Sequence, residues 1–157
     1  MNSFLCDKNE IYLYFESIRQ LKPKAVLDIG MVLYRCGALC RQAANGVIDP
    51  NVFLCGVTDK TEDIPNVYQV IYNEILTPEG LLMNQSKAKR FDLSFCFFPE
   101  QLNASGKKLL PFLKQTVSRI IIKKGMEKEL LSCLSPKISK TITYEGHQLL
   151  MLSMTGE

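Results

Sequence analysis

The most informative segment of this sequence is KAVLDIG, residues 24–30. Its apolar residues follow one another without the alternation of a half-exposed strand, and the run closes on Asp28 and Gly30. Uninterrupted apolar runs are typical of strands that are buried on both faces, as in parallel sheets. The segment therefore predicts a central strand of an α/β sheet, followed by a turn.

Helix and strand patterns alternate on both sides of this segment. Further strands are predicted at 52–57, 66–72, 91–98, 119–123, 139–144 and 148–154, and helices at 8–21, 32–44, 77–88, 105–116 and 126–134. The last two strands are joined at Glu145-Gly146-His147, which is a hairpin signal. Such alternation predicts an α/β fold with three layers. We expect a doubly wound, mostly parallel sheet of about seven strands, with a C-terminal antiparallel hairpin, in a single domain over residues 1–157.

Composition agrees with one globular domain. The chain has 157 residues, of which 46% are hydrophobic and 22% charged. It contains neither an apolar run of roughly 18–20 residues nor a signal-peptide pattern, so we expect a cytoplasmic protein without a membrane partner. The net charge of +3 is small and scattered, so no nucleic-acid partner is indicated.

The six cysteines lie within apolar runs and form no C-x-x-C pair, and His147 is the only histidine. A zinc site is therefore not expected, and no metal is predicted. We interpret the cysteines as small buried hydrophobic residues in a reducing compartment. A single histidine in a turn also offers few ways to build nucleophilic catalysis with a histidine base.

In open α/β sheets, ligands bind beyond the carboxyl ends of the strands, where the strand order reverses. Three corners of the predicted sheet lie there: Asp28-Ile29-Gly30, Gly56-Val57-Thr58-Asp59 and Phe97-Phe98-Pro99-Glu100. Any chemistry of this domain is expected at these three corners.

Residues 26–30, VLDIG, resemble the first motif of class I S-adenosylmethionine (SAM)-dependent methyltransferases. Phe91-Asp92-Leu93 is similar to the start of the family's fourth strand. A final hairpin after the fifth strand is also typical of the family. The order of elements extends the resemblance over almost the whole chain. It implies SAM as the cofactor, with Asp28, Gly30, Tyr34 and Asp59 as the candidate binding residues.

The loop after Asp28 departs from the family pattern Asp-x-Gly-x-Gly-x-Gly. Val32 and Tyr34 occupy the second and third glycine positions, where glycines let the backbone turn tightly and approach a ligand. Thr58 stands at the family's ribose-binding acidic position, and Asp59 follows it. The Tyr34 ring either closes the pocket, stacks on a ligand or faces the core.

The individual roles stay open. Asp28 either accepts a hydrogen bond from the cofactor or caps the following helix, while Gly30 fits turn geometry better than ligand contact. Asp59 is more often a plain turn residue, and Glu100 an exposed acid at the start of a helix. No catalytic residue is identified.

Three functions remain. The first is a SAM-dependent methyltransferase acting on a small molecule. The second is an inactive methyltransferase-fold module that has lost SAM and serves in binding or regulation. The third is an unrelated nucleotide-binding domain, against which the final hairpin argues. The apolar strand 148–154 leaves a homo-oligomer open, because it could pair across a dimer or lie inside the sheet.

Overall fold

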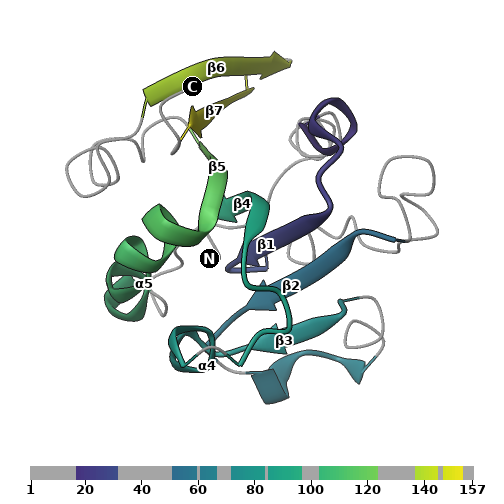
Figure 1. The fold of residues 1–157 in the computed structure, drawn as a ribbon, viewed down its shortest axis with the longest axis vertical. Coiled ribbons are helices and arrows are strands. Elements are labelled where there is room, and N and C mark those ends of the chain that lie inside the picture. Colours follow the sequence, from purple (N-terminus) through teal and green to yellow (C-terminus); the bar gives the residue numbers. More distant parts are fainter. Residues whose placement is uncertain are drawn as a thin grey trace.

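A computed structural model describes residues 17–31, 51–59, 61–66, 72–83, 85–96, 103–123, 137–144 and 147–153. Within these residues, seven strands form one sheet in the order β3-β2-β1-β4-β5-β7-β6 (Figure 1). The strands are β1 (Ala25–Ile29), β2 (Phe53–Val57), β3 (Glu74–Leu76), β4 (Phe91–Cys96), β5 (Val117–Lys123), β6 (Lys137–Tyr144) and β7 (His147–Ser153).

The pairing of the strands is parallel from β3 through β5 and antiparallel at the C-terminal end. β1 pairs in parallel with β2 and β4, while β7 runs antiparallel between β5 and β6. The expected α/β fold with a mostly parallel sheet and a C-terminal hairpin is therefore confirmed. Because β7 has a neighbour on each side, the apolar strand predicted at 148–154 lies inside the sheet.

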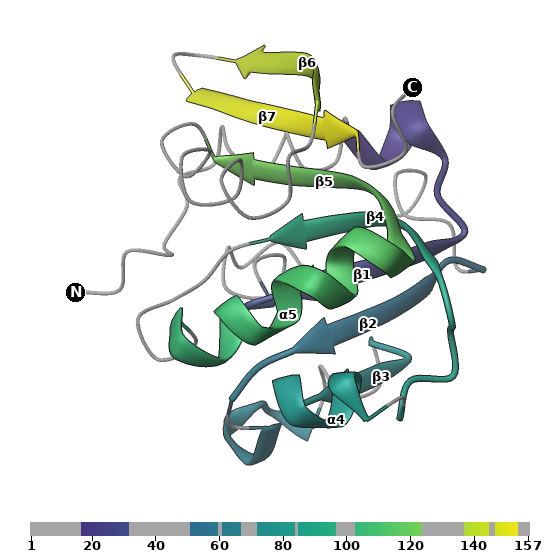
Figure 2. The same ribbon diagram turned by 60° about the vertical axis from the view of Figure 1, so that its left-hand side comes forward.

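Helices cover one face of the sheet. Helices α4 (Pro78–Leu82) and α5 (Asn103–Thr116) lie on the same side of it (Figure 2). A short 3-10 helix, η1 (Thr61–Asp63), follows β2. The helices predicted at 32–44 and 126–134 lie outside the described residues.

The helix predicted at 8–21 is described from residue 17 and is helical to residue 21. Lys22 then takes a left-handed conformation, with φ of 47°, and its N–H donates to the carbonyl of Ile18 over 2.9 Å. Pro23 follows and cannot continue the helix. The helix therefore ends at residue 21, as predicted.

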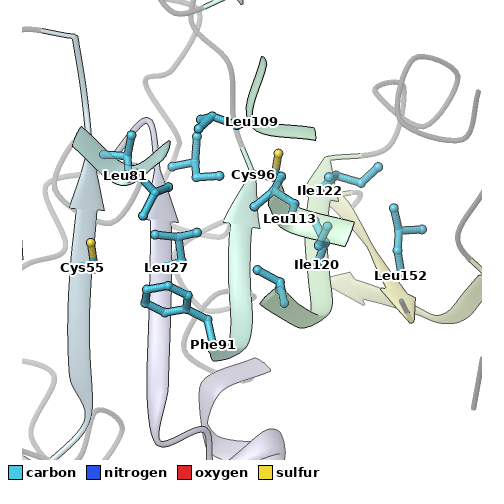
Figure 3. Packing of buried hydrophobic residues seen from close by; sticks show 13 residues of the cluster. Leu27, Cys55, Leu81, Phe91, Cys96, Leu109, Leu113, Ile120, Ile122 and Leu152 are labelled. Atoms are coloured by element: carbon cyan, nitrogen blue, oxygen red, sulfur yellow. The ribbon is translucent and has the colours of Figure 1, made fainter. Parts of the chain in front are cut away.

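A hydrophobic core lies between the sheet and helices α4 and α5 (Figure 3). Alternate residues of the two strands β1 and β2 point into it, among them Leu27 of β1 and Cys55 of β2, both fully buried. Leu109 and Leu113, one turn apart on α5, are buried against them. Fully burying one such leucine stabilises the fold by about 1.5–3 kcal/mol.

The amino ends of β1 and β4 are fastened by one carboxylate. Oδ2 of Asp92 accepts hydrogen bonds from the backbone N–H groups of Lys24, over 2.7 Å, and Ala25, over 3.0 Å. Asp92 therefore sets where β4 begins against β1, at the end of the sheet opposite the expected ligand crevice.

The strand β3 lies beyond the strand predicted at 66–72, of which residues 67–71 lie outside the described part of the chain. At the described ends of that prediction Asn66 is helical and Tyr72 lies in a bend, and β3 begins at Glu74. Asn73, the residue before β3, is already bonded to β2. Its N–H donates to the carbonyl of Leu54, and its Oδ1 accepts from the N–H of Leu54, each over 2.8 Å. The aromatic and branched residues of 66–72 favoured a strand, but Tyr72 turns inward instead.

The helix predicted at 77–88 is also shorter, because α4 ends at Leu82. Oγ1 of Thr77 caps its first turn by accepting from the N–H of Gly80 over 3.0 Å. Beyond the helix, the Ser86 hydroxyl donates to Oε1 of Glu74, and the N–H of Lys87 donates to Oε2 over 3.2 Å. These bonds fasten the α4–β4 connection to β3.

Among the described residues, no helix has the length and apolar character needed to cross a membrane.

Candidate functional site

The strand order reverses at β1, because the chain passes from β1 to β2 on one side and from β3 to β4 on the other. Ligands of open α/β sheets bind at such a point, beyond the carboxyl ends of the strands. Gly30 follows β1 there and Asp59 lies two residues beyond β2. The third predicted corner, residues 97–100 with Glu100, lies outside the described residues, as do Val32 and Tyr34.

A tight turn leaves the end of β1. The N–H of Met31 donates to the carbonyl of Asp28 over 3.2 Å, and the N–H of Gly30 donates to the carbonyl of Val57 over 2.8 Å. Gly30 has a φ of 84°, which glycine adopts without steric cost. Gly30 therefore adopts a turn conformation, and its cofactor-binding role stays a prediction.

Met31 continues the turn in a left-handed conformation, with φ of 51°. For a residue with a Cβ this conformation costs roughly 1–2 kcal/mol. The Met31 side chain is fully buried, so packing offsets the cost. The positive φ values of this turn therefore fall at Gly30 and Met31, immediately before positions 32 and 34, where the resemblance led us to expect glycines.

The Asp28 carboxylate is fully buried. Its Oδ2 accepts a hydrogen bond over 2.7 Å from the hydroxyl of Tyr72, which is itself 1% exposed. Burying a charged carboxylate is costly unless it is hydrogen-bonded, so this bond stabilises both groups. Asp28 was expected either to bind the cofactor or to cap the following helix. Its hydrogen bond to Tyr72 belongs to neither role.

Tyr72 belongs to the connection between β2 and β3, and no sequence pattern indicated its role. A buried tyrosine hydroxyl needs a hydrogen-bond partner, but no pattern indicates a partner 44 positions away. The prediction of a strand at 66–72 also did not indicate that the Tyr72 side chain is buried. Tyr72 is the residue of this region that sequence reasoning missed.

Gly56 provides the space for the Tyr72 ring. Gly56 is the partner of Asp28 in the β1–β2 register. A Cβ on Gly56 would lie 2.9 Å from Cδ2 of Tyr72 and 3.0 Å from Cγ of Met31, closer than ordinary van der Waals contact. Asp28, Met31, Gly56 and Tyr72 therefore form one packed group beside the turn, which we call the Asp28 cluster.

Asp59 differs from Asp28 in remaining partly exposed. Partial burial, and then the negative charge of Glu79 in the first turn of α4, raise the pKa of the Asp59 carboxyl. The preceding residue, Thr58, is buried and its N–H donates to the carbonyl of Leu76 over 3.0 Å. Thr58 thus continues the strand pairing, and Asp59 is the first acidic side chain beyond it.

Two of the six cysteines lie in the described residues. Cys55 and Cys96 are free thiols that are fully buried, as expected. Burial, and then the negative charge of Glu74, raise the pKa of Cys55, while burial alone raises the pKa of Cys96. Neither thiol is suited to act as a nucleophile, because the thiolate is the reactive form. In the described part of the chain, no group of three or more His, Cys, Asp or Glu residues could hold a metal ion.

No protein-family model and no curated protein matches this sequence. Solved structures do match. An O-methyltransferase from Bacillus cereus, in complex with S-adenosylhomocysteine (SAH), superposes with a TM-score of 0.62 at 11% identity, covering 96% of this chain and 83% of that one.

Two further structures extend the comparison. The SAH-bound Podospora anserina methyltransferase PaMTH1 gives a TM-score of 0.59 at 12% identity, covering 96% of this chain and 80% of that one. The ribosomal protein L11 methylase from Lactobacillus delbrueckii subsp. bulgaricus gives 0.55 at 14% identity, covering 92% and 77%. The chain therefore has a class I methyltransferase-like fold.

Proposed function

We propose that this chain binds SAM at the carboxyl ends of β1 and β2 and transfers its methyl group to a small molecule. The observation that carries the proposal is the turn at Gly30, with its φ of 84°, at the point where the strand order reverses. Because Gly30 has no Cβ, the backbone at the end of β1 can approach a ligand closely.

Asp59 fits the ribose of SAM. Ribose hydroxyls are hydrogen-bond donors, and a partly exposed carboxylate just beyond β2 is an acceptor that a ligand can reach. Its raised pKa also fits this role, because hydrogen bonds donated by a ligand would relieve the incomplete solvation of the ionised carboxylate and part of its repulsion by Glu79.

Asp28 fits SAM less well as a direct contact, because it is fully buried and holds Tyr72. We assign it to supporting the turn instead. Tyr34, the fourth candidate, would lie near the methionine part of SAM, and this position is implied by the resemblance alone.

Bound SAM would supply an activated methyl group on a sulfonium. The protein then mainly has to bind and orient both reactants, since alignment alone can lower the barrier substantially. No strong acid–base pair is required for this step, which agrees with the absence of an identified catalytic residue. The small net charge of +3 favours a small-molecule acceptor over a polyanion.

One observation favours the second candidate function, an inactive module that has lost SAM. The side chains of Tyr72 and Met31 occupy the space over Gly56. The Asp28 carboxylate, which the resemblance assigned to the cofactor, already accepts a hydrogen bond from Tyr72. In this case the domain would retain the fold as a scaffold for binding or regulation.

Isothermal titration with SAM and SAH separates the two functions. Under the first, both ligands release heat with a stoichiometry of one, and SAH competes with SAM. The absence of heat at high micromolar ligand, with protein shown to be folded by circular dichroism, would overturn the first function and leave the second.

A further inference from the structure

We infer that Tyr72 is a positioning residue that fixes the geometry of the turn at Gly30 and Met31 through Asp28. Its importance for ligand affinity rests on the proposed function, whereas its effect on the turn does not. The inference is built from the hydroxyl of Tyr72, the place of its ring and the bonds that close the turn.

A buried hydrogen bond joins Tyr72 to Asp28. The Tyr72 hydroxyl lies 2.7 Å from Oδ2 of Asp28, and both residues are almost completely buried. A donor to a charged acceptor in a dry environment fixes the carboxylate more firmly than a neutral bond would. The rotamer of Asp28 is therefore set by a residue that lies outside β1.

The second step is the position of the ring. Cδ2 of Tyr72 would lie 2.9 Å and Cε2 3.0 Å from a Cβ at residue 56, so the ring packs directly over the backbone of Gly56. Asp28 is the register partner of Gly56, which places the hydroxyl opposite the carboxylate. The absence of a side chain at 56 is thus a condition for the Tyr72–Asp28 bond.

The third step connects Asp28 to the turn. The carbonyl of Asp28 accepts the N–H of Met31, and the Met31 side chain packs beside Tyr72 over Gly56. Asp28 is therefore held on its side chain by Tyr72 and closes the turn with its main chain. Release of the carboxylate would loosen the acceptor that holds Met31 in its left-handed conformation.

The clearest test is Tyr72→Phe, which keeps the ring over Gly56 and removes only the hydroxyl. Amide hydrogen exchange, followed by NMR, should become about tenfold faster at Gly30 and Met31, because one donor to a buried charge is lost. Leu81, whose N–H donates to the carbonyl of Thr77, serves as the internal reference and should be unchanged.

A matched control separates positioning from general destabilisation. Thr77→Ala removes the cap of α4 and lowers stability, and the Oγ1 that it removes bonds the N–H of Gly80, which is not a member of the Asp28 cluster. It should leave exchange at Gly30 and Met31 unchanged. If Y72F and T77A change these two amides equally, Tyr72 has only a general structural role and the inference is wrong.

A second variant keeps the inference testable if Y72F does not fold. Gly56→Ala retains the hydroxyl but displaces the ring, and should also accelerate exchange at Gly30 and Met31. Gly80→Ala is its matched control, because the closest atom to its new Cβ would be Oε1 of the flexible Gln85 side chain, at 2.8 Å. Unchanged exchange at Gly30 and Met31 in G56A would contradict the inference.

Titration with SAH distinguishes this inference from the proposed function. If the wild type binds SAH, Y72F should bind it about tenfold more weakly, while T77A binds it as the wild type does. Unchanged SAH affinity in folded Y72F would overturn the importance of Tyr72 for the ligand. If the wild type does not bind SAH, the proposed function fails, and the exchange rates alone still decide whether Tyr72 positions the turn.

Discussion

Asp59 and Glu79 are two carboxylates near the carboxyl ends of β2 and β3 whose negative charges repel each other. Asp59 follows β2, and Glu79 lies in the first turn of α4, where the helix dipole favours its charge. Neither residue is needed for the core. Their proximity therefore has a cost for stability that a ligand-binding role of Asp59 would explain.

Asp59→Asn is expected to stabilise the protein while weakening ligand binding. Removing the charge relieves the repulsion by about 0.5 kcal/mol, since solvent screens the partly exposed pair. Loss of a charged acceptor for the ribose should weaken SAH binding about 10- to 100-fold, equivalent to about 1.5–3 kcal/mol. Thermal unfolding and SAH titration of the same sample measure the two effects.

Glu79→Gln is the matched control for D59N. It removes the same repulsion but also the favourable interaction of the Glu79 charge with the α4 dipole, so it should change stability less than D59N does. Because it keeps the Asp59 carboxylate, it should not lower the SAH affinity. Equal loss of affinity in both variants would show that the negative charge of the region, and not Asp59 itself, matters for binding.

The stabilising effect of D59N should depend on pH. Because the pKa of Asp59 is raised in the folded protein, the fold favours the protonated form and is destabilised once Asp59 ionises. The advantage of D59N should therefore be full at neutral pH. It should disappear as the pH falls below the ordinary aspartate pKa of about 3.9. An advantage that grows on acidification would contradict the direction of the shift.

Asp92→Ala should destabilise the protein by about 1 kcal/mol, because the N–H groups of Lys24 and Ala25 lose their shared acceptor. The loss is moderate since both bonds are exposed and water can replace Asp92. Urea unfolding measures the change. Glu62→Ala, a substitution of an exposed acid in η1, should change stability by less than about 0.5 kcal/mol.

The thiols of Cys55 and Cys96 should resist alkylation in the folded protein, because burial raises the pKa of both and blocks access. Peptide mapping by mass spectrometry after a pulse of iodoacetamide at neutral pH measures each cysteine separately. Labelling at both should be more than about tenfold faster in urea. Rapid labelling of either thiol in the native state would show that its strand is not buried.

Leu113→Ala should destabilise the protein by about 2–5 kcal/mol, because Leu113 is fully buried between α5 and the sheet. Leu82, at the end of α4, is 37% exposed and provides a control of the same residue type. Leu82→Ala should cost less than about 1 kcal/mol, since less apolar surface is removed from the interior. Similar costs in urea unfolding would contradict the placement of α5 on the sheet.

Local sequence patterns were sufficient for the central strands and the closing hairpin. The strands β1 and β2 are stabilised by burial on both faces. An uninterrupted apolar run in the sequence indicates such burial directly. The described ends of the strand predicted at 66–72 differ from the prediction for a tertiary reason. The pairing with β2 begins at Glu74, and Tyr72 gains a buried hydrogen bond to Asp28 by turning inward.

The candidate site was predictable in position but not in its internal contacts. The rule for parallel sheets placed Gly30 and Asp59 correctly beyond the ends of β1 and β2. The partner of Asp28 could not be predicted, because a hydrogen bond across 44 positions depends on how the β2–β3 connection folds back. The same limit applies to Gly56. Its sequence context predicts an ordinary strand residue, and only the position of the Tyr72 ring shows why a side chain there would clash.

Amide chemical-shift mapping with SAH tests the proposed binding of a SAM-type ligand where β1 and β2 end. At about 1 mM SAH, where a binding free energy of about −4 kcal/mol already gives half occupancy, the amides of Gly30 and Asp59 should shift. The amides of Lys24 and Arg90, at the opposite end of the sheet, should stay in place. Unchanged signals from Gly30 and Asp59 in the folded protein would contradict the account.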